Sequence, residues 1–304
     1  MVEDDPLRRA TSPKGSAATR SQIRGLATLP PLPRRSQELL QLLLDPDLDM
    51  LRLAELVEQT PALAARLLGV ANSAFFRTPV PVKHIPDAII RVLGLNLVRD
   101  LSVSFLLNQP FELKTCRQFD PVRFWISSME SATLAQLLTI YLPLQNPPTA
   151  SAAYLAGLLN NLGLLALVHV APEAMDKVLG QMDQQPDVSL SEIEQQVLGL
   201  NHARAGAELA MAWKLPPALA AVMGPLDQAD DGDDVMKLVS LVVLCKLINR
   251  ALKHGDFIDQ DPELSRALAG LDVHFDAWPA LLDQWHERTA DIESLAAAFA
   301  GAGR

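Results

Sequence analysis

Apolar side chains, mostly leucine and alanine, recur at intervals of three and four residues along most of this chain. That interval is the period of an α-helix with one buried face, and Leu and Ala form helices readily because they lose little side-chain freedom there. β-Branched residues are sparse, and no segment keeps the alternation of apolar and polar positions that a strand needs. The sequence therefore predicts an all-α protein.

Proline, glycine and asparagine divide this periodicity into separate helices. A Pro-rich entry over 29–33 leads into the first helix, for which Ser36 is the expected N-cap. Thr60-Pro61 begins another, because threonine caps well and proline suits a first turn. Five short helices are expected before a boundary near 108–120. The principal helices expected after it span 121–142, 151–168, 173–182, 189–198, 201–213, 217–223, 235–252, 262–269, 276–286 and 290–300.

The charge distribution argues against nucleic-acid binding. The chain carries a net charge of −10, whereas binding to a phosphate backbone usually needs a basic face. A small basic excess lies in residues 1–25, a polar segment without periodicity. We expect this segment to be a disordered tail.

Cysteine usage and hydropathy predict a cytoplasmic protein. Cys116 and Cys245 sit in apolar surroundings at no metal-like spacing, as reduced core residues do. The richest apolar stretches, 162–168 and 238–245, are too short to span a bilayer. The N-terminus lacks the apolar segment of a signal peptide, so no membrane insertion is expected.

Three segments of the chain resemble the HDOD family, a non-catalytic relative of the HD-domain phosphohydrolases. They are Leu29-Pro30-Pro31-Leu32-Pro33 with its leucine-rich helix, Thr60 to Leu68 running into Ala71-Asn72-Ser73-Ala74-Phe75-Phe76, and Ile85 to Leu95. The Ala-Asn-Ser-Ala-aromatic segment is the most specific. The resemblance implies a five-helix N-terminal bundle, residues 26–117, packed on a degenerate HD-like helical bundle, residues 118–304. It also implies a regulatory role in bacterial signalling.

The same resemblance indicates where HD phosphohydrolases hold metal: on a His, a His-Asp pair and a later Asp. This chain carries Ile126-Ser127-Ser128, Asn160-Asn161 and Lys246 at those places, and no acidic residue lies between Val239 and Arg250. Transition metals prefer imidazole and carboxylate ligands, and a lysine repels a dication. We therefore expect no metal, no cofactor and no catalysis.

Two interpretations apply to Asn72, Ser73, Phe75 and Phe76, which lie between a helix and a Pro-rich loop. Asn tolerates the left-handed conformation that ends helices, and its amide can satisfy free backbone groups. The alternative interpretation is a loop that binds a partner or ligand. His202 also has two interpretations. It resembles a His often seen there in the family, and it is equally expected as the first residue of a helix capped by Asn201.

These observations leave three functions in order of preference. The first is a non-enzymatic regulator that binds other signalling proteins, with self-association left open. The second is a small-molecule or nucleotide sensor whose ligand fills the old HD cavity. Its lining would come from Ser127, Asn160, Asn161, His202 and Lys246. The third is a residual metal-dependent phosphohydrolase.

Overall fold

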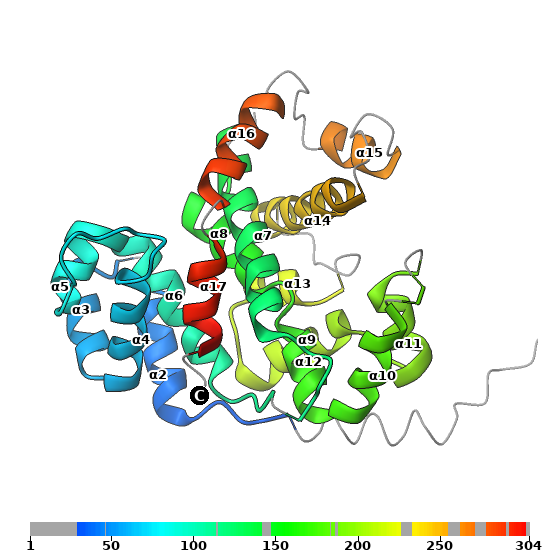
Figure 1. Ribbon diagram of the computed structural model, residues 1–304, viewed down its shortest axis with the longest axis horizontal. Helices are drawn as coiled ribbons and strands as arrows, with labels where there is room; N and C mark the ends of the chain where they lie inside the picture. The colour runs from blue at the N-terminus through cyan, green and yellow to red at the C-terminus, as the bar shows by residue number, and fades with distance from the viewer. Residues whose placement is uncertain are drawn as a thin grey trace, which may run out of the picture.

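The computed structural model describes residues 29–301, except 46, 114, 142–146, 183, 186–187, 226–232, 255–261, 271–277 and 290–291. These residues form helices and loops without a strand, which confirms the all-α prediction (Figure 1). The predicted disordered tail, 1–25, lies outside the described residues.

The N-terminal helices pack around leucine, isoleucine and valine side chains. They are α2 (Arg34–Leu43), α3 (Met50–Glu58), α4 (Pro61–Ala71), α5 (Ile85–Ala88), its π-helical continuation η1 (Ile89–Leu93), and α6 (Leu95–Asn108). One predicted cap is wrong, and Thr60, although at the N-cap position of α4, makes no side-chain cap hydrogen bond. Ser36 lies inside α2 and is buried, because the helix already begins behind Pro33. Thr60 turns its hydroxyl back to the Leu56 carbonyl at 3.3 Å, although Pro61 occupies the first turn of α4 as expected.

Longer helices follow the segment 109–120. They are α7 (Pro121–Tyr141), α8 (Ala150–Leu159), α9 (Leu162–Val170), α10 (Pro172–Met182), α11 (Leu190–Leu198), α12 (His202–Trp213), α13 (Pro217–Met223), α14 (Asp233–His254), α15 (Pro262–Gly270), α16 (Trp278–Thr289) and α17 (Ile292–Gly301). Helices α7 and α8 form the central pair. Both cysteines, Cys116 and Cys245, are free and buried, as predicted.

The helix expected over 151–168 is in fact two helices, α8 and α9, interrupted at Asn160-Asn161. The interruption lets α9 take its own direction and pack closely on α12. A side chain at Gly163 would collide with the backbone of His202 and Gly206. Residues Ala150–Val170 together are long and apolar enough to cross a membrane, contrary to expectation, but 78% of that stretch is buried inside the fold. This is the burial of core helices.

The C-terminal helix α17 lies between the N-terminal helices and α7 (Figure 1). Its Phe299 ring stacks on Phe105 of α6 with 4.1 Å between ring centroids, and lies 4.9 Å from the Trp125 ring of α7. The Trp213 indole N–H also donates to the Pro30 carbonyl at 2.9 Å. One hydrophobic core therefore continues from the N-terminal helices into α7, α8 and α9.

Candidate functional site

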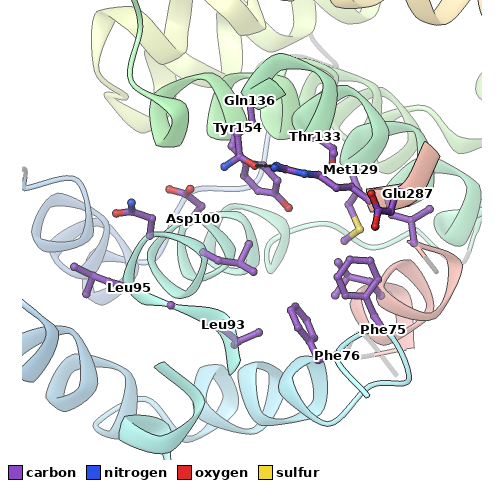
Figure 2. A pocket seen from close by; sticks show the side chains of 16 residues that line it. Phe75, Phe76, Leu93, Leu95, Asp100, Met129, Thr133, Gln136, Tyr154 and Glu287 are labelled. Carbon is purple, nitrogen blue, oxygen red and sulfur yellow. Dashed lines mark hydrogen bonds between the residues drawn. The ribbon is translucent and has the colours of Figure 1, made fainter. Parts of the chain in front are cut away.

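A pocket of about 630 Å³ opens where the segment after α4 meets α6, α7, α8, α16 and α17 (Figure 2). Its lining combines apolar side chains with a few polar ones, as ligand sites do. The lining residues are Phe75, Phe76, Leu93, Gly94, Leu95, Asn96, Leu97, Asp100, Met129, Thr133, Gln136, Tyr154, Glu287, Arg288, Ile292 and Leu295.

The polar side of the pocket is built around Asp100, a buried carboxyl on α6. Its oxygens accept from the Ser151 hydroxyl at 3.0 and 3.1 Å, and Arg99 donates to that same hydroxyl at 2.9 Å. Burial raises the pKa of Asp100 to about 7, although Ser151 and Arg99 both act to lower it. Burial and the neighbouring carboxyl also raise the pKa of Tyr154, so its phenol is neutral. Asp100 is thus poised between its neutral and charged forms near pH 7.

The apolar side of the pocket comes from Phe75 and Phe76, the aromatic residues of the HDOD-like segment. Their rings meet edge to face with 4.8 Å between centroids, and both are half-buried. Figure 2 shows Phe76 and Leu93 across the cavity from Asp100. The two phenylalanines therefore face this pocket, where Met129 and Ile292 also contribute.

Asn72 fixes the segment that carries these rings. Its amide nitrogen donates to the carbonyls of Leu68 at 2.9 Å and Val82 at 2.8 Å, and its oxygen accepts from the Val82 N–H at 2.7 Å. The predicted satisfaction of backbone groups is present. The left-handed conformation is not, since Asn72 has φ −94° and Arg77 takes the positive φ instead. The Ser73 hydroxyl is buried, and no group in the described part of the chain hydrogen-bonds to it.

The positions that the family resemblance assigns to the HD metal ligands lie outside this pocket. Gly157 of α8 packs against the backbone of Ser131 and Ala132 of α7. Ser128 lies one turn before Ser131 on α7, and Asn160 lies one turn after Gly157 at the end of α8. The Ser128 and Asn160 side chains are both buried. Ser127 and Asn161 are only half-buried, so Ser128 occupies the inward place that the sequence suggested for Ser127.

The buried polar atoms of Ser128 and Asn160 are incompletely hydrogen-bonded. The Asn160 amide nitrogen donates to the Gly157 carbonyl of its own helix. Within the described ranges, neither the Asn160 oxygen nor the Ser128 hydroxyl finds a hydrogen-bond partner. The Asn160 amide is therefore only partly satisfied, through its nitrogen.

Lys246, on α14, is the last of the positions that the resemblance assigns to the former HD centre. Its side chain is largely buried. Burial lowers the pKa of its amine to about 8, and no acidic side chain of the described residues pairs with it. Three residues on, Asn249 ties α14 to α7 by donating to the Ser131 hydroxyl at 3.0 Å. Hydroxyl, amide and amine groups do not fit a transition-metal dication, which needs imidazole nitrogens and carboxylates. Nor does the described part of the chain hold a group of three His, Cys, Asp or Glu side chains able to bind one.

His202 serves the connection between α11 and α12. Its backbone N–H and its ring Nδ1 contact the same oxygen of the fully buried Glu194, at 2.8 and 2.7 Å. Asn201 caps α12 by accepting from the Arg204 N–H at 3.0 Å, as predicted. The structure thus gives His202 a structural partner and does not bring it to the pocket.

A family model, the HDOD domain, matches residues 29–226. The chain belongs to the HDOD domain family. The match includes Asn72, Phe75 and Phe76, so the pocket is built partly from HDOD residues and partly from α16 and α17, which follow the matched region. The HD-like helical fold is likewise confirmed.

Solved structures similar to this HDOD chain share its fold. A candidate signal transduction protein of Marinobacter aquaeolei VT8 has a TM-score of 0.77 and 26% identity, over 93% of this chain and 66% of that one. An HDOD domain protein of unknown function from Geobacter sulfurreducens has a TM-score of 0.68 and 23% identity, over 91% and 97%. A candidate phosphohydrolase from Shewanella amazonensis SB2B has a TM-score of 0.67 and 24% identity, over 95% and 99%.

Among curated proteins, an uncharacterized protein of Treponema pallidum (strain Nichols) is 24% identical over 235 residues. The alignment covers 77% of this chain but 44% of that protein, so the chain spans less than half of this relative's length. Family membership and the signal transduction neighbour support a regulatory or signalling role.

Sequence reasoning found Phe75 and Phe76 but missed the polar side of the pocket. Asp100 carried a usable signal, because it is the one carboxylate in the largely apolar stretch 97–107. A carboxyl within an apolar helix costs free energy unless it is paired or used. Tyr154 and Arg288 gave no such signal, since their place depends on how distant helices meet.

Proposed function

We propose that this HDOD protein is a non-catalytic regulator that acts by binding other signalling proteins in the cytoplasm. The observation that carries the proposal is the chemistry of the former HD centre. Ser128, Asn160 and Lys246 offer a hydroxyl, an amide and a buried amine where hydrolysis would need metal ligands. A fold that keeps the helices of a phosphohydrolase without its ligands is suited to act as a scaffold.

The loop 72–82 is our candidate for the partner surface. Asn72 pins it through hydrogen bonds to Leu68 and Val82, while Val80, two residues before Val82, exposes 61% of its surface. A loop held in one conformation loses less entropy on binding than a free one. Val80 gives this pinned loop an exposed apolar side chain that a partner could contact.

Cross-linking in the native cell, followed by capture of the full chain, tests this proposal. Val80→Lys should remove the cross-linked signalling partners that the parent chain captures. Ile140→Lys is the matched control, because Ile140 is a similarly exposed aliphatic residue, 68% exposed, on α7. Partners that persist unchanged in Val80→Lys would contradict the loop assignment.

The remaining phosphohydrolase hypothesis has a direct test. The full chain, incubated with Mn²⁺ or Fe²⁺, should neither retain stoichiometric metal nor hydrolyse bis(p-nitrophenyl) phosphate above the protein-free rate. Turnover that disappears in Asn160→Ala would overturn the non-catalytic proposal. We expect no turnover because Asn160 and Ser128 present no carboxylate to offset the charge of a dication.

A further inference from the structure

We propose that the pocket between Asp100 and Phe76 binds a small organic cation, namely a protonated amine carried on an apolar body. This proposal does not rest on partner binding through the loop 72–82. It rests on a cavity, on one buried carboxyl within it, and on the aromatic wall opposite.

The size and lining of the cavity suit such a ligand. Its volume of about 630 Å³ lies within the roughly 300–1,000 Å³ range of small-molecule sites. Phe75, Phe76 and Leu93 form an apolar wall that would exclude water from the body of a ligand. Aromatic faces also attract cations through their negative π-clouds.

The charges around the cavity select the sign of the ligand. Asp100 is only 3% exposed, and Arg99 approaches it no closer than 4.0 Å. Tyr154 is a neutral phenol there, and Ser151 supplies a hydroxyl. A buried carboxylate with this incomplete pairing gains most from a cation that brings a charge-assisted hydrogen bond.

The mouth of the cavity does not reverse that preference. Glu287 and Arg288 line it with opposite charges, and both are exposed to solvent. Arg288 is directed to the Gln136 side-chain oxygen, 3.5 Å away. Water screens charges at this position far more than it screens Asp100. An anion would therefore meet a weak attraction at the mouth and a repulsion at the buried end.

A matched series of probes tests the sign directly: 1-naphthylmethylamine, 1-naphthylmethanol and 1-naphthylacetate, which share one apolar body. Isothermal titration of the full chain at pH 7.5 should show the amine binding at least about tenfold more tightly than the alcohol, since a charged hydrogen bond is stronger than a neutral one. The acetate should bind most weakly. An alcohol that binds as tightly as the amine, or no measurable binding of the amine, would overturn the proposal.

Two variants place the site. Asp100→Asn should abolish the preference for the amine, whereas Glu38→Gln, which removes an exposed carboxylate from α2, should keep it.

Thr133→Phe should reduce binding of every probe by at least about tenfold, because a bulky ring from α7 would fill the cavity while Asp100 stays in place. Circular dichroism checks that each variant folds. If Asp100→Asn does not fold, the affinity of Thr133→Phe for the amine tests whether the ligand binds in this cavity. Amine affinity unchanged in a folded Thr133→Phe would refute this location.

Discussion

At the scale of single residues, polar side chains in this protein differ in how fully they are paired. Asn72 satisfies three backbone groups, whereas the Ser128 hydroxyl and the Asn160 oxygen have no hydrogen-bond partner in the described ranges. A satisfied group stabilises a loop, and an unsatisfied one costs free energy. Replacing Asn72 should therefore disturb local structure more than replacing Ser128 or Asn160.

Asn72→Ala should lower the free energy of unfolding by about 1–3 kcal/mol, because the backbone groups of Val82 lose their partner. Asn72→Asp is the informative companion, since a carboxylate still accepts from the Val82 N–H but cannot donate to the carbonyls of Leu68 and Val82. Urea unfolding should place Asn72→Asp between the parent and Asn72→Ala. Equal stability of all three proteins would show that these hydrogen bonds contribute nothing.

Asp100 should make stability depend on pH. Its folded pKa, about 7, lies above the value of an exposed carboxyl, so the folded state holds a proton that the unfolded state has lost between about pH 4 and 7. Stability from this group is therefore complete below about pH 4 and falls as the pH rises to 7, by at most about 4 kcal/mol.

Comparison with Asp100→Asn isolates this effect from the other carboxyls. The difference in unfolding free energy between parent and variant should shift against the parent between pH 4 and 7, as measured by urea titrations at each pH. Glu38→Gln should show no comparable trend. A parent that gains stability relative to Asp100→Asn over this range would reverse the sign and reject the assignment.

At the scale of elements, glycines set how closely the central helices approach. Gly163 of α9 packs against the backbone of α12, and Gly206 of α12 packs in turn against the Met223 carbonyl of α13. A methyl group at either place has no room. These contacts hold three helices at backbone distance, so the HD-like part cannot adjust its spacing by rotating side chains.

Gly163→Ala should therefore destabilise the protein by about 1–3 kcal/mol or more, through overpacking against α12. Gly180→Ala is the control. Gly180 lies in helix α10 with nothing within 4 Å of an added methyl group, so alanine should stabilise that helix by up to about 1 kcal/mol. Thermal melts of the two variants should move in opposite directions. Equal shifts would mean that helix propensity, and not the α9–α12 contact, controls both.

The same contacts explain how much the sequence could predict. Periodicity and capping predicted α7 as 121–142, against an observed Pro121–Tyr141, because those signals are local. The break at Asn160-Asn161 was missed, because it depends on α12, some forty residues later in the chain. The assignment of Asn160 and Lys246 to former HD positions rests on motif order and stays a prediction. The pocket did not, since six separate segments line it and only their packing brings Asp100 and Phe76 together.

At the scale of the whole molecule, α17 connects parts that are distant in sequence. It packs on α4 and α7, and its Ile292 and Leu295 line the pocket beside Phe75 and Phe76. Phe299 of α17 also stacks on Phe105 of α6. The pocket and the docking of the N-terminal helices should consequently depend on the same helix.

Phe299→Ala should cost about 3–5 kcal/mol, the usual loss for a buried phenylalanine, and its effect should be confined to the elements that α17 touches. Hydrogen exchange followed by mass spectrometry should show faster exchange in α4, α6 and α7, because these helices lose their shared contact. Peptides from α10 and α11, which pack on each other, should keep their protection. Phe119→Ala, which truncates a partly buried ring, should leave α4 unchanged. Uniformly faster exchange in Phe299→Ala would instead mean that the whole chain opens as one unit and that α17 has no special role in joining its parts.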